Sequence, residues 1–217
     1  MKRTLVSSLV CALALSLCFS AASRADDPVP QPDPHSIFIT DILYNGSGCP
    51  PDSAVIDLAP DGQAFTVIYS EFIAESGPGI SLARARKNCQ LNLTVHVPQG
   101  FTYAIAAVDY RGYANLAAGA SGLQKATYYF QGQEPQASTW RGFTGAFDDD
   151  WHFRDEVEYA ALVWAPCGEQ RSLNINSQLR IDKGSASSSS SSIMAMDSED
   201  GSIRQIYHFH WRTCDQP

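Results

Sequence analysis

The sequence predicts an all-β fold: a single antiparallel β-sandwich of about eight strands, stabilised by two disulfide bonds. Three observations predict this fold. Apolar and polar residues alternate with period two, Gly- and Pro-rich turns separate the alternating segments, and four cysteines follow the N-terminal segment. Because Gly or Pro interrupts almost every window, no stretch favours a long helix. A jelly roll built from similar strands is the alternative.

The alternation is clearest at SLNINSQLRID, residues 172–182, where Leu and Ile alternate with Asn, Gln, Arg and Asp. The same period appears at 63–70 and 90–97. Segments of this kind place one face against a core and the other toward solvent. Further strands are predicted at 37–44, 101–110, 126–131, 157–164 and 203–212.

The closing segment YHFHWRTC, residues 207–214, predicts the last strand. Its aromatic residues fall on one face, as a core strand requires, while His208 and His210 fall on the other beside Arg212. Two neighbouring imidazoles are an alternative metal site. We favour no metal there, because the Arg212 cation disfavours a bound cation and no nearby residue supplies a third ligand.

The N-terminal segment has the organisation of a secretory signal peptide. Lys2 and Arg3 precede an apolar run, and small residues lead to a cleavage site after Ala25, with Ala22 as the alternative. We therefore expect residues 1–25 to be removed and the protein to be secreted, although a periplasmic or cell-surface location is also compatible. No later stretch has the length of a membrane span, so we expect no stable membrane insertion after cleavage.

The mature chain divides into a short tether and one domain. Residues 26–35 contain four prolines and predict an extended tether. The domain then covers residues 36–217, and a low-complexity Ser-rich loop at 184–192, expected to be mobile, precedes the last strand.

The charge of the mature chain argues against polyanionic partners. Removal of residues 1–25 leaves 12 basic and 23 acidic residues, a net charge of −11. Nucleic acids and anionic lipid surfaces bind through clustered Lys and Arg. We therefore expect no nucleic-acid partner.

The four remaining cysteines predict two disulfide bonds, for which three pairings exist. We favour Cys49 with Cys89 and Cys167 with Cys214, because neighbouring pairs suit a chain that folds as consecutive hairpins. Zinc binding by these residues is disfavoured, since no CxxC motif occurs and exported thiols usually oxidise.

Seven short motifs occur in one order along the chain and carry a resemblance to a known family. The motifs are GSGCP at 46–50, ARKNCQLNL at 85–93, YRGYANL at 110–116, YYFQG at 128–132, WAPCG at 164–168, LNINSQLR at 173–180 and WRTC at 211–214. With these motifs the chain resembles the secreted family called domain of unknown function number forty-three sixty, over roughly residues 43–214. The resemblance implies a small, exported, cysteine-paired domain and implies no particular activity.

Aromatic residues near two predicted loops are the candidate binding residues. Tyr110, Arg111 and Tyr113 suit sugar stacking or carboxylate binding, because Arg presents a planar fork and Tyr an amphipathic face. Trp140 and Trp151 flank a Gly-rich segment and are further candidates for the same surface, although a Trp is more often a core or rim residue than a ligand contact. A structural role, with Arg111 paired to its neighbour Asp109, is the alternative.

The segment FDDDWHFRDEVEY, residues 147–159, gathers acidic residues and is expected to form a solvated acidic loop. Two alternatives are calcium binding by Asp148, Asp149 and Asp150, and glycoside hydrolysis by a pair of carboxylates. The 148–150 run lacks the ligand spacing of a calcium-binding EF-hand loop. For glycoside hydrolysis, the sequence identifies no catalytic pair of carboxylates.

We therefore expect a secreted, non-catalytic binding or interaction module for an extracellular glycan or protein. One alternative is a secreted hydrolase, glycan-directed or metal-assisted, that uses the 148–150 acids, His152, Glu156 or the terminal histidines. The other is a structural protein of the envelope or matrix.

Overall fold

The computed structural model of the chain describes residues 30–158, 161–196 and 205–215. The predicted signal peptide and the first part of the predicted tether lie outside these ranges. Of the tether's last residues, Pro32 is buried against the domain, and Pro34–Ser36 form a short 3₁₀ turn, η1. None of the helices in the described ranges is long and apolar enough to cross a membrane.

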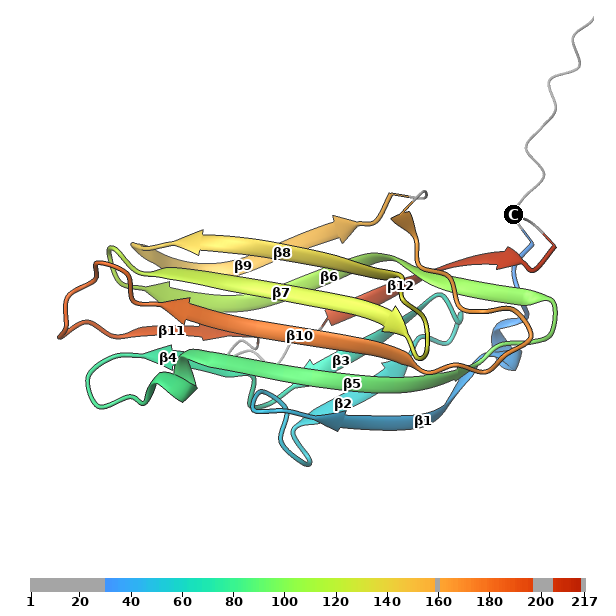
Figure 1. Cartoon of the computed structure of the whole chain (residues 1–217), viewed down its shortest axis with the longest axis horizontal. Coiled ribbons are helices and arrows are strands. Elements are labelled where there is room, and N and C mark those ends of the chain that lie inside the picture. Colours follow the sequence, from blue (N-terminus) through green and yellow to red (C-terminus); the bar gives the residue numbers. More distant parts are fainter. Residues whose placement is uncertain (1–29, 159–160, 197–204, 216–217) are drawn as a thin grey trace, which may run out of the picture.

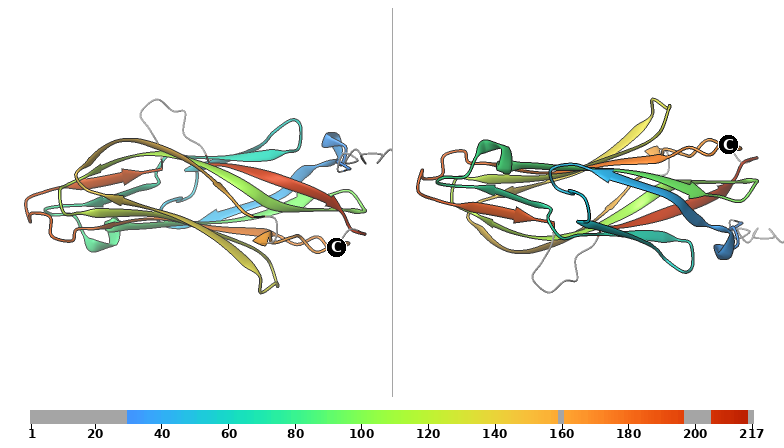
Figure 2. Two further views of the ribbon diagram at one scale, coloured as in Figure 1. Left: turned by 90° about the horizontal axis from the view of Figure 1, so that it is seen from above. Right: turned by 90° about the horizontal axis from the view of Figure 1, so that it is seen from below.

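The structure is an open sandwich of two antiparallel sheets, seen as two layers in Figure 2. The first sheet faces the viewer in Figure 1. In order across this sheet, its strands are β1 (Phe38–Asn45), β5 (Arg86–His96), β10 (Leu173–Asp182), β7 (Ser121–Phe130) and β8 (Gln136–Thr144).

The second sheet is organised around the long strand β6 (Phe101–Leu116). One edge of β6 pairs with β9, and the other edge pairs first with β12 and then with β11. The remaining strands extend the sheet beyond β12 and β11. Its strands besides β6 are β2 (Ala54–Leu58), β3 (Ala64–Tyr69), β12 (Gln205–Thr213), β11 (Ser192–Ala195), β4 (Ile73–Ser76) and β9 (Phe147–Glu156).

The all-β prediction is confirmed, but the described residues form twelve strands rather than about eight. The alternation did not reveal β2, β4, β8, β9 and β11, which are short or largely polar. The strand predicted at 157–164 is wrong, since its described residues contribute only an isolated bridge between Trp164 and Ala104. The Ser-rich segment leads from β10 into β11 and not directly into the last strand.

The predicted inward-facing residues form the core between the sheets. Leu173, Ile175, Leu179 and Ile181 of β10 are all buried, and the aromatic residues of β12 are buried as expected. Aromatic rings dominate the contacts across the seven-stranded sheet, for example the stacked rings of Phe65 and Tyr207, with centroids 4.6 Å apart. Large buried rings contribute much of the burial free energy in a core of this kind.

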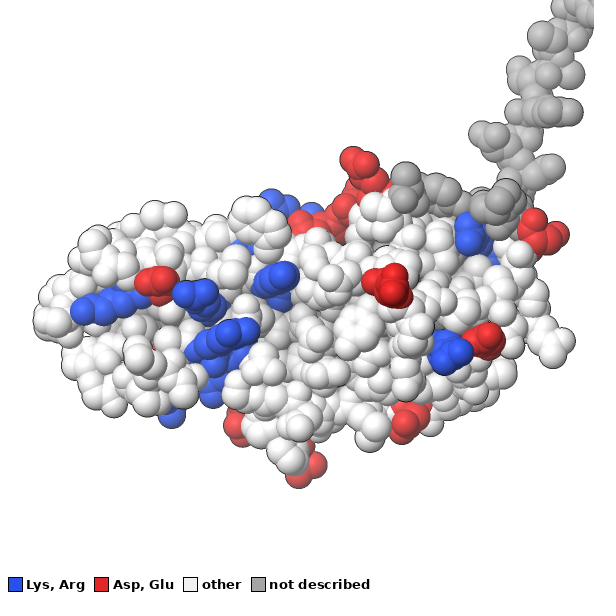
Figure 3. Space-filling model, in the orientation of Figure 1, with Lys and Arg blue, Asp and Glu red and all other residues white. Residues whose placement is uncertain are grey.

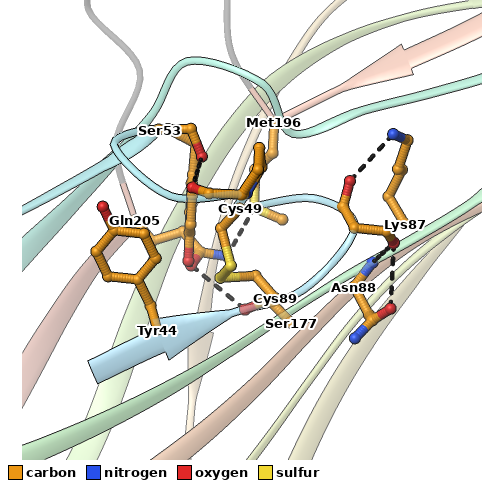
Figure 4. The surroundings of a disulfide bond; sticks show 12 residues. Tyr44, Cys49, Ser53, Lys87, Asn88, Cys89, Ser177, Met196 and Gln205 are labelled. Atoms are coloured by element: carbon orange, nitrogen blue, oxygen red, sulfur yellow. Dashed lines mark hydrogen bonds between the residues drawn. A yellow bond between two sulfur atoms is a disulfide. The ribbon is translucent and has the colours of Figure 1, made fainter.

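Both predicted disulfide bonds are confirmed. Cys49 and Cys89 are fully buried and connect the loop after β1 to β5 (Figure 4). Glycine is required at position 46 of this loop, because a Cβ there would lie 2.1 Å from the Asn88 carbonyl oxygen. Cys167 and Cys214 connect the segment after Trp164 to the end of β12.

A buried polar network lies near the first disulfide. The Gln205 side-chain oxygen accepts hydrogen bonds from the Tyr207 hydroxyl (2.8 Å) and the Tyr69 hydroxyl (3.1 Å). Burial raises the pKa of both tyrosines well above their usual value. The same cause raises the pKa of Tyr103, Tyr110 and Tyr128.

The double substitution Cys49→Ala and Cys89→Ala should lower the free energy of unfolding by about 4 kcal/mol, because it removes the constraint on a loop of 40 residues in the unfolded chain. Urea unfolding followed by tryptophan fluorescence measures this loss. A double variant as stable as the wild type would contradict the prediction.

We also expect alkaline unfolding driven by the buried tyrosines. Their pKa is raised in the folded state, so folding holds protons that the unfolded chain releases above about pH 10. Stability is therefore fully present below pH 10 and falls above it, by up to about 1.4 kcal/mol per pH unit for each such tyrosine. Tyrosinate absorption and circular dichroism should change together; ionisation of all tyrosines in a folded protein would contradict this.

Candidate functional site

The predicted binding residues lie within strands, so their assignment to loops is wrong. Tyr110 lies in β6 and is 0% exposed, and Trp151 lies in β9 and is 6% exposed. The Tyr110 hydroxyl lies 2.7 Å from the Thr139 hydroxyl of the opposite sheet. Both rings therefore belong to the core and offer almost no surface to a ligand.

The remaining candidates, of which Arg111 and Trp140 are exposed and Tyr113 is half-buried, lie on opposite sides of the molecule. Arg111 and Tyr113 face outward from β6 in the seven-stranded sheet, whereas Trp140 faces outward from β8 in the five-stranded sheet. The single aromatic platform expected from the sequence is therefore not formed. Trp140 is 66% exposed, which makes it the largest exposed aromatic surface among the candidates.

The predicted acidic loop is strand β9, paired along its length with β6. Asp148 accepts a hydrogen bond from the Tyr113 hydroxyl (2.6 Å), and Asp148, Asp149 and Asp150 are all exposed. Across the described parts of the chain, His, Cys, Asp and Glu form no group of three or more that suits a metal ion. Calcium binding by these acids stays an alternative.

An ion-pair cluster occupies the outer face where β9, β6 and β12 meet. The Asp109 carboxylate, with its side chain 16% exposed, lies 2.8 Å from Arg154 Nη1 and 2.6 Å from His208 Nε2. Arg154 Nε also donates to Glu156 (3.2 Å), and His152 Nε2 lies 3.9 Å from Asp109. The sequence did not reveal this cluster, because its members are 45 and 99 residues apart from Asp109 along the chain.

The two histidines of β12 have different partners. His208 contacts Asp109, while the His210 ring packs edge-on against Trp164, with centroids 5.8 Å apart. The Arg212 guanidinium lies over the same Trp164 ring at 4.0 Å. This face of β12 is therefore occupied by contacts within the protein.

A cavity of about 580 Å³ lies at one end of the sandwich beside the Cys167–Cys214 bond. Its charged residues Glu169 and Arg171 neutralise each other at 2.7 Å, and Thr102 is bonded to a backbone carbonyl (2.6 Å). Much of its polar surface is thus already engaged, so this cavity is not our favoured binding site.

A shallower hollow of about 360 Å³ lies on the outer face of the seven-stranded sheet. It is lined by Tyr113 and Asn115 of β6 together with residues of β4 and the segment entering β11. Glu75 on its rim is paired with Arg84. Of the predicted binding residues, only Tyr113 contributes to this hollow.

The outer face of the five-stranded sheet presents a continuous polar surface. Strands β5, β10, β7 and β8 are in register, so their outward side chains form rows across the sheet. We call these positions the amide face. From β5 to β8 they are Arg86, Arg180, Leu123 and Gly142, then Asn88, Gln178, Lys125 and Trp140, then Gln90, Asn176, Thr127 and Ser138, and finally Asn92, Asn174, Tyr129 and Gln136.

The amide face combines hydrogen-bonding side chains with two aromatic rings and three cations. None of these sixteen positions is Asp or Glu, and the nearest acid on the same side of β10 is Asp182, which follows Arg180 at the next outward position. At the usual strand spacing it measures about 14 Å across the strands and about 20 Å along them. Some of its polar groups are paired, such as Asn92 with Asn174 (2.9 Å) and Thr127 with Ser138 (2.8 Å). The sequence showed the alternating polar residues of 86–96 and 172–182. It did not show which residues of adjacent strands lie beside them.

The chain matches a known protein family over most of its length. Residues 35–214 match the family described as "Domain of unknown function (DUF4360)". The chain belongs to this family. An "Uncharacterized secreted protein" of Arthroderma benhamiae is 42% identical over 183 residues, which cover 84% of this chain and 74% of the relative. This DUF4360 protein is secreted, in agreement with its two disulfide bonds.

Two solved structures show low similarity to this DUF4360 protein. TmCBM61 in complex with β-1,4-galactotriose aligns with a TM-score of 0.28 and 10% identity, covering 80% of this chain and 89% of that chain. A structure of the infectious bursal disease virus Gx strain aligns with a TM-score of 0.24 and 11% identity, covering 81% of this chain and 37% of that chain. TM-scores this low carry no argument about function.

We expect the Asp109 cluster to stabilise the fold. Asp109→Asn should lower the free energy of unfolding by about 1 to 2 kcal/mol, because Arg154 and His208 lose a partly buried carboxylate. Asp150→Asn, at an exposed position of β9, is the matched control and should change it by less than about 0.5 kcal/mol. Equal urea midpoints for the two variants would contradict the prediction.

Proposed function

We propose that this secreted protein is a non-catalytic binding module that holds an extracellular polysaccharide on the amide face. The observation that carries the proposal is the position of Trp140. Its ring is 66% exposed, at a mid-strand position, in a row with Lys125, Gln178 and Asn88. An indole exposed in this way lowers the solubility of the protein and presents a flat apolar surface beside polar groups.

The chemistry of a sugar matches this surface. The apolar face of a pyranose ring stacks on an indole, while its hydroxyl groups both donate and accept hydrogen bonds. Asn and Gln side chains also do both, since each carries two N–H donors and an oxygen acceptor. Rows of such amides beside Trp140 and Tyr129 therefore suit a chain of sugars better than an apolar ligand.

The backbone supports the amide face as a rigid surface. β5, β10 and β7 are each hydrogen-bonded on both edges, and their inward residues are buried in the core. Preorganised side chains lose little conformational freedom when a ligand binds. A polymer is favoured over a small molecule because the face is extended and forms none of the cavities described above.

We expect Trp140→Ala to weaken polysaccharide binding at least about tenfold, because the stacking surface is lost while the fold is retained. Affinity electrophoresis against a panel of neutral and acidic plant and fungal polysaccharides, followed by calorimetry on each ligand found, measures this change. Leu82→Ala is the matched control, because it removes a side chain that is 92% exposed and lies in η2 (Leu82–Ala85), outside the amide face.

Two results would count against the proposal. Binding that is unchanged in Trp140→Ala would place the ligand elsewhere. Release of new reducing ends from any polysaccharide in the panel would favour the secreted hydrolase instead.

A further inference from the structure

We propose that the polysaccharide is anionic, of the uronate class, and that Arg86, Arg180 and Lys125 bind its carboxylates. This inference rests on the proposed function and adds the charge class of the ligand. The three cations occupy two neighbouring rows of the amide face, and Lys125 lies directly opposite Trp140 on the adjacent strand. Carboxylates and sugar rings of one polymer would therefore meet the cations and the indole together.

These cations are poorly neutralised by the protein itself. With the Gln178 amide oriented so that its oxygen faces Arg86, Arg86 donates from Nε and Nη2 to this oxygen, which belongs to a neutral group, at 2.6 and 2.7 Å. Arg180 has one loose carboxylate contact, to the exposed Asp182 at 3.6 Å. Within the described ranges Lys125 has no ion-pair partner.

Four arginines outside the amide face have close carboxylate partners, whereas Arg111 and Arg212 have none among the ion pairs of the described residues. Arg141, Arg154 and Arg171 lie 2.7 to 2.8 Å from a carboxylate, and Arg84 is also paired with one. Figure 3 shows the Lys and Arg side chains gathered on the left half of the face that carries β5, β10 and β7, with few acids among them. On a chain with an excess of acidic residues, a cluster of three cations without close carboxylate partners indicates an anionic ligand.

The geometry favours uronates over a denser polyanion. Arg presents a planar fork that matches a carboxylate. Nucleic acids require many phosphate contacts, whereas this face offers three cations on a protein of net negative charge, and long-range repulsion opposes a dense polyanion. A uronate polymer has one carboxylate on each sugar, so it supplies charge and stackable rings together.

The experiment uses two forms of one polymer: polygalacturonate and its fully methyl-esterified form. Calorimetry at low salt should show at least about tenfold tighter binding of the free acid, and added salt should remove this preference by screening. Double-stranded DNA and vesicles containing phosphatidylserine are tested alongside and should bind more weakly than polygalacturonate.

The outcomes separate this inference from the proposed function. Equal binding of the two forms, dependent on Trp140, overturns the inference and leaves polysaccharide binding in place. If neither form binds while a neutral glycan of the panel does, the inference is also overturned and polysaccharide binding is again left in place. Tighter binding of DNA or vesicles overturns the inference, because the cations then serve a phosphate ligand.

Variants assign the charge preference to the amide face. Arg86→Gln with Lys125→Gln should reduce polygalacturonate binding roughly tenfold, about threefold for each exposed cation, and leave binding of the methyl ester unchanged. Arg111→Gln is the matched control, because it removes an exposed cation from the opposite sheet. An equal loss per charge in the control would overturn the inference, since the effect would then follow net charge alone.

Discussion

The aromatic row of β12 is the contact on which the rest of the structure depends. Tyr207, Phe209 and Trp211 are buried between the sheets, and β12 is hydrogen-bonded to β3 on one edge and β6 on the other. Tyr207 meets Tyr128 of the five-stranded sheet, with ring centroids 6.5 Å apart. Since each buried ring contributes about 2 to 3 kcal/mol, this row stabilises both the pairing within one sheet and the packing of the two sheets.

This packing leaves the outer faces for function. Tyr110 and Trp151, which looked like binding residues, are used to fill the core, so recognition depends on side chains that the sandwich does not need. On the seven-stranded sheet, Asp109 and its partners satisfy one another. On the five-stranded sheet, the amide face keeps hydrogen-bonding capacity, an exposed indole and unbalanced positive charge. The two outer faces therefore differ in chemistry although they share one core.

Period-two alternation predicted the strands in which one face is buried along the whole length. It did not predict strands in which the buried residues do not follow this period. In β10 and β12 the buried residues follow period two, so both strands and their inward residues could be predicted. In β9 three consecutive aspartates hide the period, and they indicated a loop although Trp151 is buried in the same strand. Short β11 directly follows the Ser-rich stretch, and its pairing with β4 and β6 decides its conformation.

The sequence by itself determined the all-β class, the disulfide pairing, the family and the inward residues of the strongly alternating strands. These properties follow from local periodicity and from cysteine order along the chain. Only the tertiary structure decided which outward residues share a face. Lys125 and Trp140 become neighbours through strand register, and Tyr113 is separated from them by the full thickness of the sandwich, because pairing and layer packing join residues that are distant in sequence.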